Sequence, residues 1–111
     1  MTSEMPPTSS HTQGVWVVNP HLESIVLCLE PWGDEIQLPG GSSFLVMFEG
    51  PSGNFPEVEW EEGRVTVCGW SGSVVSVYHD GKVLRTSGSF RVPEGWEAIR
   101  KLVFPRRTKI N

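Results

Sequence analysis

The sequence predicts an all-β domain: an antiparallel β-sandwich, a jelly roll or a small barrel of about seven to nine short strands, with one short C-terminal helix. Fourteen valines against one alanine favour sheet over helix. Twelve glycines and nine prolines require frequent turns. Short apolar segments recur along the 111 residues with hairpin-like links between them, and this length has room for one such domain.

The chain begins with a polar stretch, residues 1–14, that includes a proline pair. This stretch lacks the apolar surface that would offset its ordering entropy, so we expect a disordered tail. Apolar segments bounded by turn residues follow it. We expect strands over residues 15–18, 24–30, 35–38, 44–49, 57–60, 64–70, 74–79 and 82–86, with residues 89–92 as a candidate for one more.

Two local patterns in this region predict a turn type and the orientation of a strand. The Asp80-Gly81 pair is typical of a two-residue type I′ hairpin, in which both central positions need a positive φ. In residues 57–60, Val58 and Trp60 alternate with two glutamates, so we expect Trp60 to face the core.

The period changes near the C-terminus. Trp96, Ile99, Leu102 and Val103 share one helical face, which predicts a helix over about residues 94–103 that ends before Pro105. The expected organisation is therefore a tail (1–14), a single β domain (15–104) and a basic tail (105–111).

Charge is divided unevenly along the chain. Residues 1–63 contain ten acidic residues and no lysine or arginine, whereas residues 64–111 contain all nine basic residues and three acids. In one interpretation, acidic and basic strands lie side by side in one sheet, where opposite charges across a strand pair are stabilising. The other is an acidic face and a basic end that steer the molecule toward a charged partner. Because ten acids would oppose a polyanion, we do not expect a nucleic-acid partner.

The cysteines and the lengths of the apolar runs indicate where in the cell the protein is found. The longest apolar run is five residues, far below the roughly twenty that a membrane span needs. The N-terminal segment also lacks the pattern of a signal peptide. Cys28 and Cys68 lie in apolar segments without nearby zinc-ligand spacing, and we expect buried free thiols. These features predict a cytoplasmic protein without a membrane partner.

Catalytic and metal-binding patterns are weak. The three histidines lack the His-x-His spacing that cupin metal sites use, so we expect no metal and no cofactor. Glu57 and Glu59 lie about 6.6 Å apart along one strand face, near the spacing of glycosidase carboxylates. A charge-guarded edge strand is the favoured interpretation of this pair. Residues 69–73 come close to a Gly-x-Ser-x-Gly elbow, but Ser73 replaces the second glycine, which favours a simple turn.

Five tryptophans are the most distinctive feature of the composition. We expect Trp60 and Trp96 in the core, and Trp16, flanked by valines, is compatible with either face. Trp32 and Trp70 lie at turns. They either close the open end of the sandwich or provide aromatic surface for recognition.

These observations lead to three hypotheses about function. The first is a non-catalytic interaction or accessory module that binds a protein partner or a second copy through a loop cluster of Trp32, Trp70 and Tyr78. In this hypothesis Glu57 and Glu59, or the basic tail, provide electrostatic steering. The second is a small-ligand module in which a carbohydrate stacks on Trp32 or Trp70. The third is a small cupin-like enzyme that uses Glu57 and Glu59, or His79.

Overall fold

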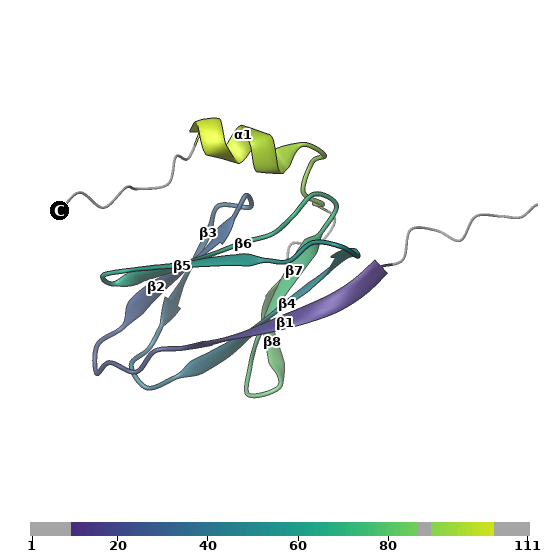
Figure 1. Ribbon diagram of the computed structural model, residues 1–111. Coiled ribbons are helices and arrows are strands. Elements are labelled where there is room, and N and C mark those ends of the chain that lie inside the picture. The colour runs from purple at the N-terminus through teal and green to yellow at the C-terminus, as the bar shows by residue number, and fades with distance from the viewer. Residues whose placement is uncertain (1–9, 87–89, 104–111) are drawn as a thin grey trace, which may run out of the picture.

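The computed structural model describes residues 10–86 and 90–103 and shows two four-stranded β-sheets with one short helix (Figure 1). The first sheet has the strand order β1-β4-β7-β8, and the second has the order β3-β2-β6-β5. The elements are β1 (Ser10–Val18), β2 (Ile25–Glu30), β3 (Asp34–Leu38), β4 (Ser43–Pro51), β5 (Glu57–Glu61), β6 (Arg64–Cys68), β7 (Val74–His79), β8 (Lys82–Thr86) and α1 (Trp96–Val103). The predicted all-β class with a C-terminal helix is confirmed.

The core lies between the two sheets and follows from strict alternation. In β4, Phe44, Val46 and Phe48 are buried, while the residues between them are partly exposed. The second sheet contributes the facing layer from its two central strands. The buried cluster consists of Val17, Ile25, Leu27, Leu29, Leu38, Phe44, Val46, Phe48, Val65, Val67, Trp70, Val75 and Val77.

Strand β1 begins earlier than the sequence predicts. Residues 10–18 pair with β4 in one unbroken antiparallel register, from Ser10 opposite Pro51 to Val18 opposite Ser43. The expected disorder is therefore wrong for residues 10–14, because strand pairing satisfies the backbone whatever the polarity of the side chains. Residues 1–9 and the expected basic tail, 105–111, lie outside the described residues.

One strand pairing departs from the expected antiparallel pattern. Strands β2 and β6 run parallel, from Val26 opposite Arg64 to Glu30 opposite Cys68, while the other five pairings are antiparallel. The connection between them passes through β3, β4 and β5 before β6 returns in the direction of β2. Parallel strands need such a long crossover. The candidate ninth strand is not formed in the described residues 90–92, and residue 89 lies outside them.

The hairpin turn and the helix agree with the local signals. Asp80 and Gly81 have φ values of 53° and 77°, as a type I′ turn requires. The helix begins at Trp96, which is buried as expected. Ser71 donates hydrogen bonds from its amide (2.8 Å) and its hydroxyl (2.7 Å) to the carboxylate of Glu97. These contacts join α1 to the β6–β7 turn.

A buried asparagine organises the connection between β1 and β2. The Asn19 amide donates hydrogen bonds to the carbonyls of Glu23 (2.8 Å) and Leu38 (3.0 Å). Its side-chain oxygen accepts a bond from the His21 amide at 2.9 Å. Asn19 thereby links the loop to the end of β3.

Candidate functional site

Trp70, one of the expected recognition residues, belongs to the core. Its side chain is 1% exposed and packs against Phe48, with ring centroids 5.7 Å apart. The indole Nε1 donates a hydrogen bond to the carbonyl of Pro51 at 2.9 Å. The hydroxyl oxygen of Ser73, which lies in the turn that follows Trp70, accepts a hydrogen bond from the Trp70 backbone amide. Of the two alternatives, closure of the core holds for Trp70, and no ligand can stack on it.

Trp32 lies half-buried at the same end of the sandwich. Its ring packs against Phe48 and meets Phe90 edge-on, with centroids 6.4 Å apart. Its Nε1 donates a hydrogen bond to the carbonyl of Phe90 at 3.1 Å. A Cβ at Gly69 would lie 2.5 Å from the Trp32 ring, so this position admits only glycine. Tyr78 projects from the outer face of the first sheet, and the expected loop cluster of three aromatics does not form.

Trp60 was expected in the core, and this prediction is wrong. Its side chain is 53% exposed, although it lies opposite Val65, which is fully buried. Val58, on the same side of β5, is also exposed. The alternation therefore gives the correct face, but the core stops at β6 and leaves the edge strand β5 uncovered.

Glu57 and Glu59 lie on the outer face of the second sheet, where Glu57 is opposite Cys68 and Glu59 is opposite Thr66. Cys28 occupies the neighbouring strand on this face. Both cysteines are buried and form no disulfide, and the Cys68 sulfur lies 3.7 Å from a carboxylate oxygen of Glu30. Arg64 donates a hydrogen bond to the Cys28 sulfur at 2.9 Å. Burial raises the pKa of the Cys28 thiol, and the Arg64 charge partly opposes this shift.

Among the residues that the structure describes, three arginines lie beside carboxylates. Arg64 lies 3.9 Å from Glu35 within the second sheet. Arg85 pairs with Asp34 at 3.0 Å between the two sheets. Arg91 lies 3.4 Å from Glu49. The expected pairing of acidic and basic strands within one sheet therefore describes Arg64 and Glu35 alone among these pairs, since Arg85 reaches the other sheet and Arg91 lies outside the strands.

The outer face of the first sheet carries an apolar surface that the sequence analysis did not identify. The registers place Trp16 opposite Leu45, Leu45 opposite Tyr78 and Tyr78 opposite Val83. Trp16, Leu45 and Tyr78 alternate with more buried residues of their strands. Trp16 is 65% exposed and Val83 is 55% exposed. Together with Met47, which lies beside Leu45 on β4, these residues form the surface that we call the outer apolar face.

This surface is hollowed where it meets the β7–β8 turn. A depression of about 310 Å³ is lined by Trp16, Leu45, Met47, Tyr78, Asp80 and Gly81. The Asp80 carboxylate lies 3.5 Å from His79 Nε2, and its side chain is 84% exposed. The hollow thus offers aromatic and aliphatic surface with one carboxylate at its rim. Of these residues, only Tyr78 was a predicted site residue.

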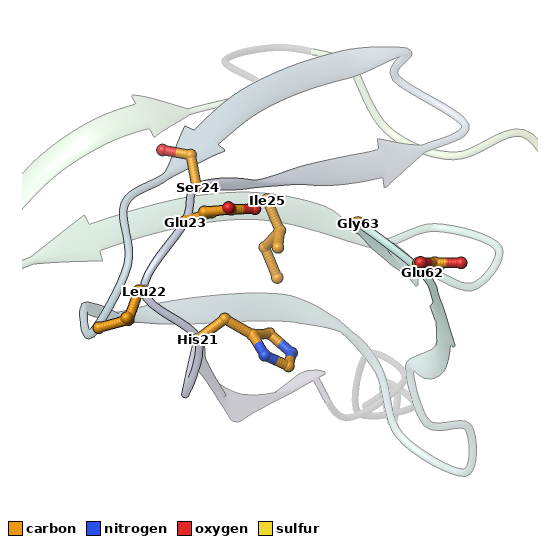
Figure 2. Close-up of a pocket in the computed structure, with 7 residues that line it drawn as sticks. All are labelled: His21, Leu22, Glu23, Ser24, Ile25, Glu62 and Gly63. Atoms are coloured by element: carbon orange, nitrogen blue, oxygen red, sulfur yellow. The ribbon is translucent and has the colours of Figure 1, made fainter.

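A second hollow, of about 400 Å³, lies between the β1–β2 loop and the β5–β6 turn. Figure 2 shows its lining residues, among them the ring of His21 and the carboxylates of Glu23 and Glu62. In this view the three ionisable groups do not converge on one point. Within residues 10–86 and 90–103, no three His, Cys, Asp or Glu side chains are grouped to hold a metal ion.

The remaining histidines are engaged in packing. His11 stacks on Trp70 with ring centroids 5.9 Å apart, and its Nε2 lies 2.8 Å from the amide nitrogen of Gln13. His79 packs on Phe44 and its Nδ1 lies 3.2 Å from the Ser43 carbonyl oxygen. Both rings thus pack against aromatic residues, and His11 Nδ1 is buried without a hydrogen-bond partner in the described part of the chain.

Comparison of the chain with protein-family models, with curated proteins and with solved structures finds no match. Among the described residues, no helix is both long and apolar enough to cross a membrane.

Proposed function

We propose that this protein is a non-catalytic interaction module that binds a partner protein through the outer apolar face. The observation that carries the proposal is the cross-strand row of Trp16, Leu45, Tyr78 and Val83 on the solvent side of the first sheet. An antiparallel sheet packed on one side ordinarily presents polar residues on the other. Contiguous exposed apolar surface with aromatic residues is typical of protein–protein contact sites.

The chemistry of the hollow supports a protein partner. Its lining combines Trp16, Leu45 and Met47 with a single exposed carboxylate, that of Asp80. This composition suits a protein segment that buries apolar side chains and places a lysine or arginine beside Asp80. A carbohydrate would need several convergent polar groups, whereas most of this lining is apolar and its polar side-chain groups are the Asp80 carboxylate, the Tyr78 hydroxyl and the Trp16 indole N–H. The lining therefore favours a protein partner over a sugar.

A cytoplasmic location is part of the proposal. Cys28 and Cys68 are buried and form no disulfide. The cytoplasm is a reducing compartment in which such cysteines stay as thiols.

The proposal is tested with the full chain as bait in a lysate of its native host, read by quantitative mass spectrometry. The test variant is the double substitution Tyr78→Ser, Val83→Ser, which makes the far half of the outer apolar face polar. The control is Trp60→Ser, which removes a similarly exposed aromatic residue from another strand. Any enriched protein is then purified, and its Kd for each variant is measured by calorimetry.

We expect one protein to bind the wild type and the control equally, and the double variant at least ~10-fold more weakly, which corresponds to about 1.4 kcal/mol. Equal binding by all three proteins would place the contact elsewhere on the molecule. Equal loss in the double variant and in the control would show that the outer apolar face has no special role. Enrichment of no protein by the wild type would contradict the proposal.

A further inference from the structure

The two sheets present four edge strands, and three of them carry features that block pairing with another chain. Strand β5 has glutamates at three of its five positions. Strand β3 is five residues long and includes two acids. Strand β8 contains a lysine and an arginine, and its pairing with β7 is interrupted by a bulge. Charge, short length and bulges are the means by which natural sheets prevent edge-to-edge association.

Strand β1 has none of these features. Its nine residues, SHTQGVWVV, include no Asp, Glu, Lys, Arg or Pro. Its register with β4 is continuous, so no bulge turns the edge away. Within the described part of the chain, β4 is the only strand that pairs with β1. Figure 1 shows β1 along the lower side of the sandwich, far from α1.

The backbone groups on the free edge can be assigned by alternation. The Asn19 amide donates to the Ser42 carbonyl at 3.0 Å, and the Asn19 carbonyl accepts from Gly41 at 2.9 Å. Because successive residues of a strand point their N–H and C=O groups to opposite sides, the odd-numbered residues of β1 bond to β4. The even-numbered residues, including Thr12, Gly14 and Trp16, present these groups at the free edge.

We propose that β1 pairs antiparallel with β1 of a second copy around a two-fold axis, which joins the two first sheets into one continuous eight-stranded sheet. This inference rests on the proposed function, because both hold that the chain acts through contacts with other protein chains. A second copy is the occupant because an uncharged strand does not repel its own copy. Strand-to-strand pairing about a two-fold axis is also antiparallel by symmetry.

The side chains select one register, in which Val15 lies opposite Val15 of the second copy. Trp16 then faces Gly14 of the second copy, and the symmetric contact repeats this pair. A Cβ at Gly14 would lie 3.0 Å from the Met47 sulfur, so Met47 borders the space beside the glycine. An indole that crosses Gly14 therefore reaches the Met47 thioether, and aromatic residues pack favourably against both glycine and sulfur across strands.

Sedimentation velocity over a range of concentrations tests the dimer. The variant Thr12→Pro removes an N–H that points to the free edge and leaves the bonds to β4 in place. The matched control Thr12→Val keeps this N–H. We expect the wild type and Thr12→Val to dimerise, and Thr12→Pro to raise the dimer Kd at least ~10-fold. Circular dichroism confirms that each variant is folded.

The register is tested by cysteine cross-linking. In the proposed dimer the two copies of residue 15 form a non-hydrogen-bonded pair, with Cα atoms about 4.5 Å apart, within disulfide range. We expect Val15→Cys to form an intermolecular disulfide under mild oxidation, and Ser10→Cys, near the strand end, to form none. The wild type, with both native cysteines buried, gives the background.

The results separate this inference from the proposed function. Monomeric wild type at all concentrations, equal dimerisation of Thr12→Pro and the control, or cross-linking at position 10 rather than 15 would each overturn the β1 pairing. The double variant Tyr78→Ser, Val83→Ser leaves β1 intact and is expected to remain dimeric. If that variant alone becomes monomeric, copies associate through the outer apolar face and the β1 proposal is wrong.

Discussion

The fold buries Trp70 and leaves Trp60 about half exposed, so substitution of each by alanine should lower the free energy of unfolding by different amounts. Trp70 is 1% exposed, packs on Phe48 and donates a hydrogen bond to the Pro51 carbonyl. Removing a fully buried aromatic side chain costs about 3–5 kcal/mol of unfolding free energy. The Pro51 carbonyl also loses its donor, which adds about 1 kcal/mol. We expect Trp70→Ala to lose about 4–6 kcal/mol of unfolding free energy in total.

Trp60 provides the matched comparison because it is 53% exposed on an edge strand. An aromatic side chain buries up to about 150–250 Å². Roughly half of this area is already in water at Trp60, so about 100 Å² of buried surface is at stake. At about 25 cal/mol per Å², and allowing for the contacts that alanine keeps, the loss is about 1–2 kcal/mol.

Urea unfolding followed by far-UV circular dichroism measures both values. The two losses differ by about 2–5 kcal/mol. With an m-value of about 2 kcal/mol per M, the unfolding midpoint of Trp70→Ala should therefore lie about 1–2.5 M below that of Trp60→Ala. Trp70→Phe keeps most of the ring volume and isolates the hydrogen bond. Equal midpoint losses for the two alanine variants would refute the placement of Trp60 beyond the limit of the core.

Two further predictions concern polar groups. Asn19→Ala removes a buried side chain that satisfies three backbone groups, so we expect a loss of about 2–3 kcal/mol in thermal unfolding, against under about 0.5 kcal/mol for the exposed control Gln37→Ala. The Ser10 hydroxyl and then the Arg91 charge hold the pKa of Glu49 below its ordinary value. Such a carboxylate stabilises the fold above its unfolded pKa of about 4.3, and this contribution is lost as pH falls through the lower folded value. Glu49→Gln should therefore flatten the acid side of the stability–pH curve, and an unchanged slope would contradict this assignment.

Features of the fold that depend on neighbouring residues were predictable from the sequence. The Asp80-Gly81 turn depends on two consecutive positive φ values, which this pair adopts readily, and the structure has them. The face of each strand is likewise set by alternation, and even Trp60 lies on the predicted side of β5. Alternation does not determine how far the opposite sheet extends over that side. For this reason the sequence alone could not predict that Trp60 is exposed.

The candidate site depends on distant pairing, and this explains why only Tyr78 was identified beforehand. Residues 15–18 are all apolar, so no alternation shows which of them faces solvent. The pairing of Trp16 with Leu45, and of Leu45 with Tyr78, decides the question, and these residues are 29 and 33 positions apart in the chain. A cross-strand surface of this kind has no motif that a local pattern could show.

The two outer faces of the sandwich provide an internal comparison that bears on function. On the second sheet, outward positions of the edge strand are held by Glu57 and Glu59, as packing rules for a solvated face require. On the first sheet, the equivalent outward position of β1 is held by Trp16. The chain places charged residues on the outer face of β5, so its edge strands do not all carry exposed apolar residues. Exposed apolar residues on the outer face of the first sheet therefore conflict with the rule that a solvated sheet face is polar. Conflicts of this kind concentrate at functional sites. The tryptophan of β1, rather than the glutamates of β5, is therefore the residue on which a functional experiment should begin.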